Sequence, residues 1–161
     1  MLFGVGNTML GDDGIGPPRV AERMNGCPPG WHAADCGTAP PENFTGVVRK
    51  MRPRILVIVD AADMRLSPPG EFRRIHPDAV GQAGFDTHSL PPLTHIIEYL
   101  RETVPKMPEI MLIGIQPGGP VTFHEEISAP VIRGGGDEVA EMLRNGEEGG
   151  RIPAYIPDNP E

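Results

Sequence analysis

Residues 55–60 read Ile-Leu-Val-Ile-Val-Asp, and residues 110–115 read Ile-Met-Leu-Ile-Gly-Ile. Both runs are apolar, rich in β-branched side chains and free of polar alternation, which is typical of strands buried on both faces of a parallel sheet. Residues 1–5 predict a third, short strand of this kind, and residues 32–36 and 71–75 predict two weaker strands. The alternation in 71–75 favours an edge position. A sheet buried in this way requires helices on both of its faces.

Helical periodicity lies between the predicted strands. Two helices are predicted from apolar residues at the spacing i, i+3, i+4 and i+7: Phe44, Val47, Val48 and Met51 in the first, and Leu93, Ile96, Ile97 and Leu100 in the second. Residues 19–24 predict a helix after two prolines. Residues 131–143 predict a last helix, with a break or loop expected at glycines 134–136. The order of elements predicts an α/β domain of three layers, which binds ligands at the carboxyl ends of its strands.

Length and composition limit the function. The chain has 161 residues, 22 acidic and 14 basic, and a formal net charge of -8. One domain is expected, and the acidic balance argues against nucleic acid. Two cysteines and the lack of a signal peptide or membrane-spanning stretch predict a cytoplasmic protein. We expect a domain at residues 1–144 and a mobile tail at 145–161, where Gly, Glu and Pro leave little to bury.

Carboxylates follow two of the predicted strands. Asp12 and Asp13 lie in the glycine-rich segment after the first strand, and Asp60 follows the strand at 55–59. A carboxylate at the end of a buried strand is costly unless a cation or hydrogen bonds compensate its charge. Two simpler interpretations stay open: the acids at 12 and 13 cap the next helix, and Asp60 accepts hydrogen bonds from loop N–H groups.

One of the five histidines differs in position from the others. His88 stands in a polar loop directly before a helix, where it could face the same strand ends or simply lie on the surface. Asp13, Asp60 and His88 together offer two oxygens and one nitrogen to a divalent metal and leave positions open for water or substrate. The combination predicts a metal-linked site.

Other catalytic and binding motifs lack essential residues. A dinucleotide fingerprint would need glycine at position 9, where Met9 stands, and the neighbouring acids would repel a phosphate. A small nucleotide-binding module is therefore the weakest interpretation. His-Glu-x-x-His and Gly-x-Ser-x-Gly motifs are also absent from the sequence, which excludes the usual zinc-protease and serine-hydrolase arrangements.

Five blocks of sequence, in order along residues 1–143, carry a family resemblance: residues 4–17, 35–43, 59–64, 87–90 and 113–117. Together they resemble the maturation endopeptidases of nickel-iron hydrogenases, in particular the branch acting on hydrogenase 3 (formate hydrogenlyase) and its archaeal relatives. The resemblance implies an endopeptidase that removes a C-terminal extension from a hydrogenase large-subunit precursor after nickel insertion. It also implies a twisted, mostly parallel five-stranded sheet between helices, similar to the phosphorylase/hydrolase-like fold.

The resemblance places metal binding and catalysis on Asp13, Asp60 and His88. Nickel would be held in the precursor or at this site, with zinc or cadmium as substitutes, so that the activity is of an aspartic or a metallo type. The expected partner is the large-subunit precursor, and this protein is expected to be a monomer in the cytoplasm. Cys36 stands where the family has glycine, and it acts as a packed small side chain or as a soft contact to nickel. A non-catalytic chaperone that binds metal or precursor is the alternative function.

Overall fold

The computed structural model describes residues 1–7, 9–16, 20, 30–37, 41–66, 68–79, 86–87, 93–119, 126–145 and 152–153. Within these ranges, the side chains at 34–37, 41–44, 79, 86–87, 93–94 and 96 lie outside the description.

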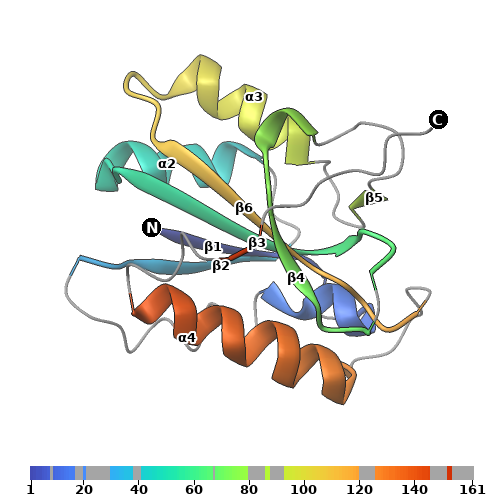
Figure 1. The fold of residues 1–161 in the computed structure, drawn as a ribbon. Coiled ribbons are helices and arrows are strands. Elements are labelled where there is room, and N and C mark those ends of the chain that lie inside the picture. The colour runs from blue at the N-terminus through green and yellow to red at the C-terminus, as the bar shows by residue number, and fades with distance from the viewer. Residues whose placement is uncertain are drawn as a thin grey trace.

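A mixed, mostly parallel sheet forms the centre of the molecule (Figure 1). Its strands are β1 (Leu2–Val5), β2 (Ala33–Gly37), β3 (Ile55–Asp63), β4 (Phe72–Ile75), β5 (Asp86–Thr87) and β6 (Glu109–Ile115). The order is β2-β1-β3-β6-β4, in which only β4 runs antiparallel to its neighbour, and β5 pairs antiparallel with the end of β3. Among the described residues, a strand lies at each position predicted from the sequence, β4 lies at the edge as expected, and the short β5 was not predicted.

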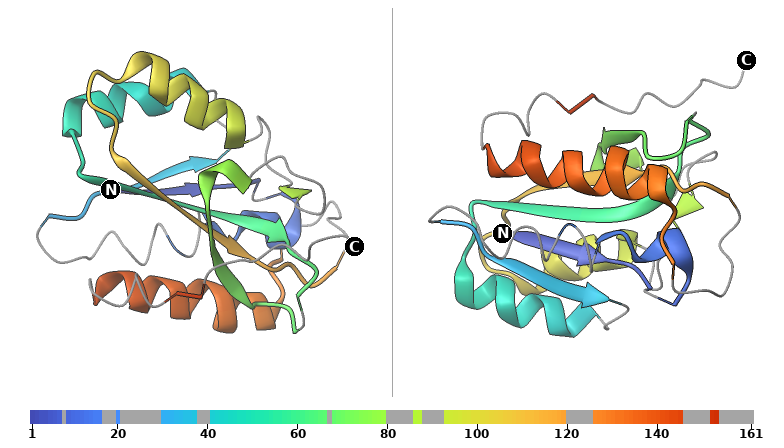
Figure 2. Two further views of the ribbon diagram at one scale, coloured as in Figure 1. Left: turned by 45° about the horizontal axis from the view of Figure 1, so that its top comes forward. Right: turned by 90° about the horizontal axis from the view of Figure 1, so that it is seen from below.

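Helices cover both faces of this sheet, which confirms the three layers (Figures 1 and 2). On one face lie α2 (Pro41–Met51) and α3 (Leu93–Thr103). On the other, the π-helix η4 (Val131–Asp137) continues into α4 (Glu138–Arg144). Two short 3-10 helices are η1 (Gly11–Gly14) and η3 (Pro77–Ala79). The predicted helix at 19–24 falls almost entirely outside the described residues, and no described helix has the length and apolar character to cross a membrane.

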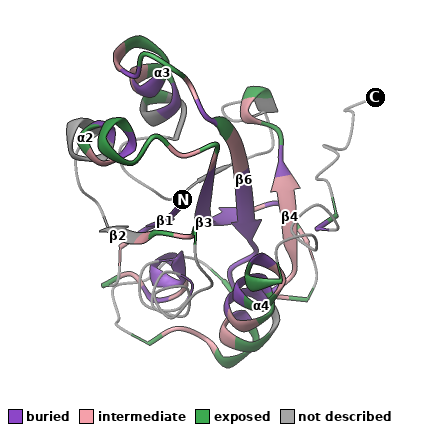
Figure 3. Cartoon of the chain, turned by 90° about the vertical axis from the view of Figure 1, so that its left-hand side faces the viewer, coloured by how far each residue is buried: buried purple, intermediate pink, exposed green. Residues whose placement is uncertain are grey.

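The strand β3 divides the hydrophobic core into two halves. Leu56 and Ile58 pack with the cluster under α2 and α3, whereas Val57 and Val59 pack with the cluster under η4 and α4. Figure 3 shows β3 buried along its length. Because each fully buried aliphatic side chain contributes about 1.5–3 kcal/mol, the unbroken apolar run at 55–59 stabilises both layers at once.

The glycines at 134–136 do not break the last helix, contrary to our expectation. The chain passes through them as the wider turns of η4 and continues as α4. A Cβ at Gly135 would overlap Cγ2 of Ile115 on β6. The glycine therefore lets this helix approach the sheet closely, and the packing gained there offsets the low helix propensity of glycine.

The predicted apolar stripe of α2 is only partly correct. Val48 is fully buried and Val47 packs against the core, but Met51 is 45% exposed. Met51 is the last residue of α2, and Arg52 follows it in the left-handed conformation, with φ of 46°. The side chain of Met51 thus lies beyond the part of the helix that covers the sheet.

We expected the segment at 145–161 to have little to bury, and Ile152 is a buried residue among the few of this segment that the structure describes. Ile152 is 1% exposed and belongs to the cluster under η4 and α4. The N–H of Arg74 on β4 donates a 2.8 Å hydrogen bond to the carbonyl oxygen of Pro153. These two residues therefore pack against the edge of the domain.

Candidate functional site

Asp60 lies inside a strand rather than after one. We expected the strand to end before it, but β3 continues to Asp63, because Ala61 pairs with Ile115 on β6 and the next two residues pair with β5. Asp60 is 2% exposed and lies opposite Gly114 on β6. It is an acid in a strand that is otherwise apolar up to Ala62.

Asp13 lies in η1, which follows β1, and is 1% exposed. The N–H of Asn7 donates a 2.8 Å hydrogen bond to its Oδ2 atom. This carboxylate therefore has a hydrogen-bond partner in the loop after β1. The N-terminal cap position of η1 itself is Leu10.

Two glycines bring Asp13 and Asp60 to the same place. A Cβ at Gly6, where φ is 139°, would overlap the carbonyl oxygen of Asp13 and lie 3.7 Å from Oδ1 of Asp60. A Cβ at Gly16 would lie 2.6 Å from the carbonyl oxygen of Val59. The segment after β1 therefore crosses the end of β3 in backbone contact, which only glycine permits. The backbone of Asp13 and the carboxylate of Asp60 therefore both lie beside Gly6, and the shared role of the two acids in one site stays a prediction.

The third predicted ligand, His88, lies outside the described residues. The residue before it, Thr87, pairs in β5 with Ala62, which is two residues beyond Asp60. Among the residues that the structure describes, no cluster of three or more His, Cys, Asp or Glu side chains could hold a metal ion. The metal-ligating role of His88 stays a prediction.

Asp12, beside Asp13, has a different environment. Its carboxylate accepts hydrogen bonds from the N–H of Gly118 at 2.7 Å, the N–H of Ser128 at 2.6 Å and the hydroxyl of Ser128 at 3.0 Å. These partners come from the chain after β6 and from the approach to η4. Sequence reasoning considered Asp12 as a helix cap or, like Asp13, as a carboxylate that could activate the attacking water. It missed these contacts, which span more than a hundred residues.

Gln116 is a second residue that the sequence analysis did not single out. It is buried, and its Oε1 atom accepts the N–H groups of Met64 at 2.8 Å and Leu66 at 3.2 Å. Its Nε2 atom donates to Oδ1 of Asp63 at 3.2 Å. Gln116 thereby fixes the chain that leaves β3. The available signal was a glutamine directly after an apolar strand, where a buried amide must find partners.

The backbone of Cys36 lies at an irregularity of the sheet. Gly4 pairs with Asp35, but the next residue, Val5, pairs with Gly37, so that Cys36 is the additional residue of a bulge. Bulges re-aim side chains near functional sites. The side chain of Cys36 lies outside the description, and its proposed contact with nickel stays untested.

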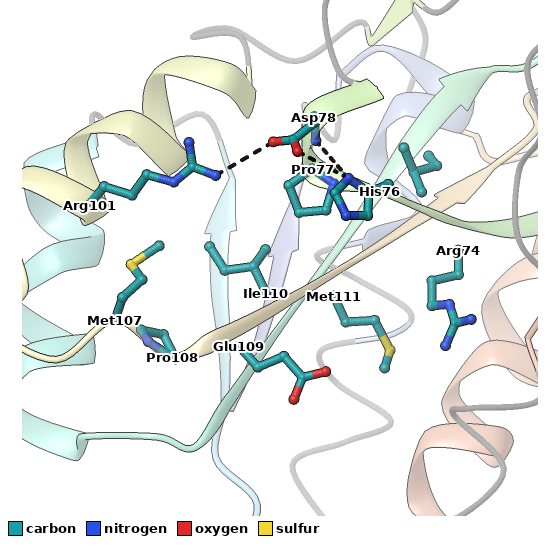
Figure 4. A pocket seen from close by; sticks show the side chains of 11 residues that line it. Arg74, His76, Pro77, Asp78, Arg101, Met107, Pro108, Glu109, Ile110 and Met111 are labelled. Carbon is teal, nitrogen blue, oxygen red and sulfur yellow. Dashed lines mark hydrogen bonds and ion pairs between the residues drawn. The ribbon is translucent and has the colours of Figure 1, made fainter.

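A cavity of about 530 Å³ lies elsewhere, between the starts of β6 and η3 and the end of α3 (Figure 4). Arg101 and Asp78 lie across it from one another, with a 3.8 Å ion pair. Its floor includes Ile110 and Met111, at the opposite end of β6 from Gly114, which pairs with Asp60. The cavity therefore does not contain the buried acids.

The fold defines the class: an α/β protein, in which ligands bind where parallel strands end. The family model described as hydrogenase maturation protease matches residues 18–145. Hydrogenase 3 maturation protease of Escherichia coli K12 is 41% identical over 132 residues, 81% of this chain and 80% of that protein.

Solved structures agree. The endopeptidase HycI from Escherichia coli has a TM-score of 0.79 at 35% identity, covering 99% of this chain and 98% of that one. The nickel-iron hydrogenase maturation protease HycI from Thermococcus kodakarensis has a TM-score of 0.72 at 32% identity, covering 89% and 88%. This chain belongs to the hydrogenase maturation protease family. The matched residues include Asp60 and His88, whereas Asp13 precedes them.

Proposed function

We propose that this protein is the endopeptidase that removes the C-terminal extension of a nickel-loaded hydrogenase large-subunit precursor. Family membership supports the reaction class. The observation that carries the assignment of the site is that two buried acids lie beside Gly6, Asp13 with its backbone and Asp60 with its carboxylate. Two acids buried in one place lower stability, and such an arrangement is common where charge is used in binding or catalysis.

The donor set fits a divalent cation. Carboxylate oxygens from Asp13 and Asp60 suit borderline and hard divalent metals, and the imidazole of His88 would add the nitrogen that nickel and zinc favour. The pairing of Thr87 with Ala62 supports this assignment, because it attaches the chain just before His88 to the strand that carries Asp60. A cation between the two carboxylates would offset the repulsion between their charges.

Nickel enters this proposal as part of the substrate. The three residues would engage the nickel already inserted in the precursor, so that only loaded precursor places its scissile bond at the site. In the alternative, a divalent metal resident at the same residues would polarise the scissile carbonyl and lower the pKa of water. In both cases the chain holds the substrate with Asp13, Asp60 and His88 around the cleaved bond.

The geometry favours Asp13 over Asp12 as the carboxylate that takes the proton from the attacking water. The carboxylate of Asp12 accepts three hydrogen bonds from Gly118 and Ser128, in the chain after β6. The backbone of Asp13 instead lies beside Gly6, which is also next to the carboxylate of Asp60. A general base must be within hydrogen-bonding reach of the proton that it removes, and Asp13 would meet this condition for a water bound beside Gly6 and Asp60.

Intact mass spectrometry of a hydrogenase large-subunit precursor tests the proposal. With catalytic amounts of this protein, nickel-loaded precursor should lose one fixed C-terminal peptide over many turnovers, and nickel-free precursor should stay intact. Equal cleavage of both precursors would overturn the role of nickel in recognition. A stable complex with no product would instead identify a maturation chaperone.

The cellular setting is part of the same proposal. We infer a monomer acting in the cytoplasm, where nickel insertion into the precursor would precede the cut. Sedimentation of the protein alone and with precursor tests the monomer. A dimer that cleaves only as a dimer would contradict it.

A further inference from the structure

The carboxylate of Asp12 joins three parts of the chain. Oδ2 accepts the N–H of Gly118 and the hydroxyl of Ser128, and Oδ1 accepts the N–H of Ser128, all at 2.6–3.0 Å. Gly118 follows β6, and the carbonyl oxygen of Ser128 accepts the N–H of Ile132 in η4. One side chain therefore holds η1 against both segments, through hydrogen bonds that ionisation of the acceptor strengthens.

Asp12 and Asp13 are adjacent in the single turn of η1, with Cα atoms about 3.8 Å apart. Successive side chains of a 3-10 helix point about 120° apart, since the helix has three residues per turn. Fixing the direction of Asp12 therefore fixes the direction of Asp13. The side chain of Asp13 points in a different direction from that of Asp12, and its Oδ2 atom accepts the N–H of Asn7.

We propose that Asp12 is a positioning residue, which orients η1 so that the carboxylate of Asp13 stands beside Asp60. This inference rests on the proposed function for its effect on turnover, but its structural part is independent of that function. The two neighbouring acids then have separate roles. Asp13 faces the site, and Asp12 holds η1 to Gly118, which follows β6, and to Ser128, which precedes η4.

The test compares Asp12→Asn with Ser128→Ala and with Asp78→Asn, an exposed acid at the other end of the sheet. Asparagine keeps the shape of Asp12 but replaces one acceptor oxygen with a donor, so at least one backbone N–H loses its partner. Ser128→Ala removes only the hydroxyl contact. Hydrogen exchange at the amide of Asn7 reports the hydrogen bond to Asp13 directly, and steady-state kinetics report turnover.

We expect Asp12→Asn to speed exchange at Asn7 by at least about tenfold, which is a loss of about 1.4 kcal/mol in local opening free energy. Exchange at Ile58, in the middle of β3, should change much less. The kcat should fall by about 10²-fold with KM within threefold, because a misplaced catalytic group affects the transition state rather than substrate binding. Ser128→Ala should give a smaller effect of the same kind, and Asp78→Asn should give none.

Equal acceleration at Asn7 and Ile58 in Asp12→Asn would show a general loss of stability and overturn the proposal. Unchanged exchange at Asn7 would overturn it as well. If the unaltered protein fails to cleave precursor, the proposed function fails, and exchange at Asn7 in Asp12→Asn then decides the positioning role alone. If Asp12→Asn is too unstable to measure, Gly118→Ala replaces it. Its new Cβ would lie 3.2 Å from Oδ2 of Asp12 and would disturb the same hydrogen bond at Gly118.

Discussion

The two ends of the central sheet differ in how far their charged side chains are buried. At the carboxyl end, Asp13 and Asp60 are almost fully buried. At the amino end of β6, the charged residues Asp78 and Arg101 are 72% and 55% exposed and border the cavity of Figure 4. The cavity is therefore the less informative feature. Burial of charge lowers stability, so the end with the buried acids is the better candidate for the catalytic site.

Removing one of the proposed metal-binding side chains should have the largest effect. We expect Asp60→Ala and His88→Ala each to lower precursor processing by about 10³-fold or more, because the proposed site loses a group that acts at the cleaved bond. Thermal unfolding of Asp60→Ala should stay cooperative, since the change removes a buried charge without removing an apolar contact. Intact mass spectrometry of the precursor and calorimetry of each variant measure the two effects.

Loss of the whole thermal transition in Asp60→Ala would contradict a functional role for the buried acids. The carboxylate would then be needed for folding. Asp78→Ala is the matched control, because it removes an acid of the same size from the exposed end.

The next effect concerns stability at the carboxyl end. Gln116→Leu should lower the free energy of unfolding by about 2–4 kcal/mol, because the buried N–H of Met64 and the partly buried N–H of Leu66 lose their shared acceptor. Urea unfolding at 25 °C measures the change. A loss below about 0.5 kcal/mol would show that water replaces the amide at this position.

Most of the fold follows from local sequence patterns. The apolar runs at 55–59 and 110–115 predict β3 and β6 because burial on both faces removes any polar alternation. The glycines at 134–136 gave a wrong prediction, since helix propensity contains no information about the close contact of Gly135 with Ile115 on β6. Likewise, the sequence gives no local signal for β5, whose two residues depend on β3 for their pairing.

The site could be predicted in part. Acids after apolar strands indicated Asp13 and Asp60, because parallel strands end at one edge and place such residues together. The contacts of Asp12 with Gly118 and Ser128, and those of Gln116 with the chain after β3, join segments far apart in sequence. Such pairs have no spacing that a single sequence reveals.

Alanine substitution at two helix glycines should change the stability less, and in opposite directions. Gly135→Ala should destabilise the protein by about 1–3 kcal/mol, because its Cβ would meet Ile115 where β6 ends. Gly46→Ala, in α2, should stabilise it by about 0.5–1 kcal/mol, because nothing lies within 4 Å of the new Cβ and alanine favours the helix. Chemical denaturation of both variants gives the comparison, and Ile115→Ala should relieve the cost of Gly135→Ala. Without such relief, the close contact with β6 would not be the cause.

The smallest effect is expected at the amino end. Arg101 and Asp78 form their ion pair at 3.8 Å, and His76 lies 3.6 Å from the same carboxylate, with all three side chains more than half exposed. A double-mutant cycle of Asp78→Ala and Arg101→Ala should therefore give a coupling energy below about 1 kcal/mol that decreases further with salt. Precursor processing should be unchanged in both variants, since neither side chain belongs to the edge that holds Asp13 and Asp60. A tenfold fall in processing with intact stability would mean that the precursor also contacts this end, and the functional difference between the two ends would no longer hold.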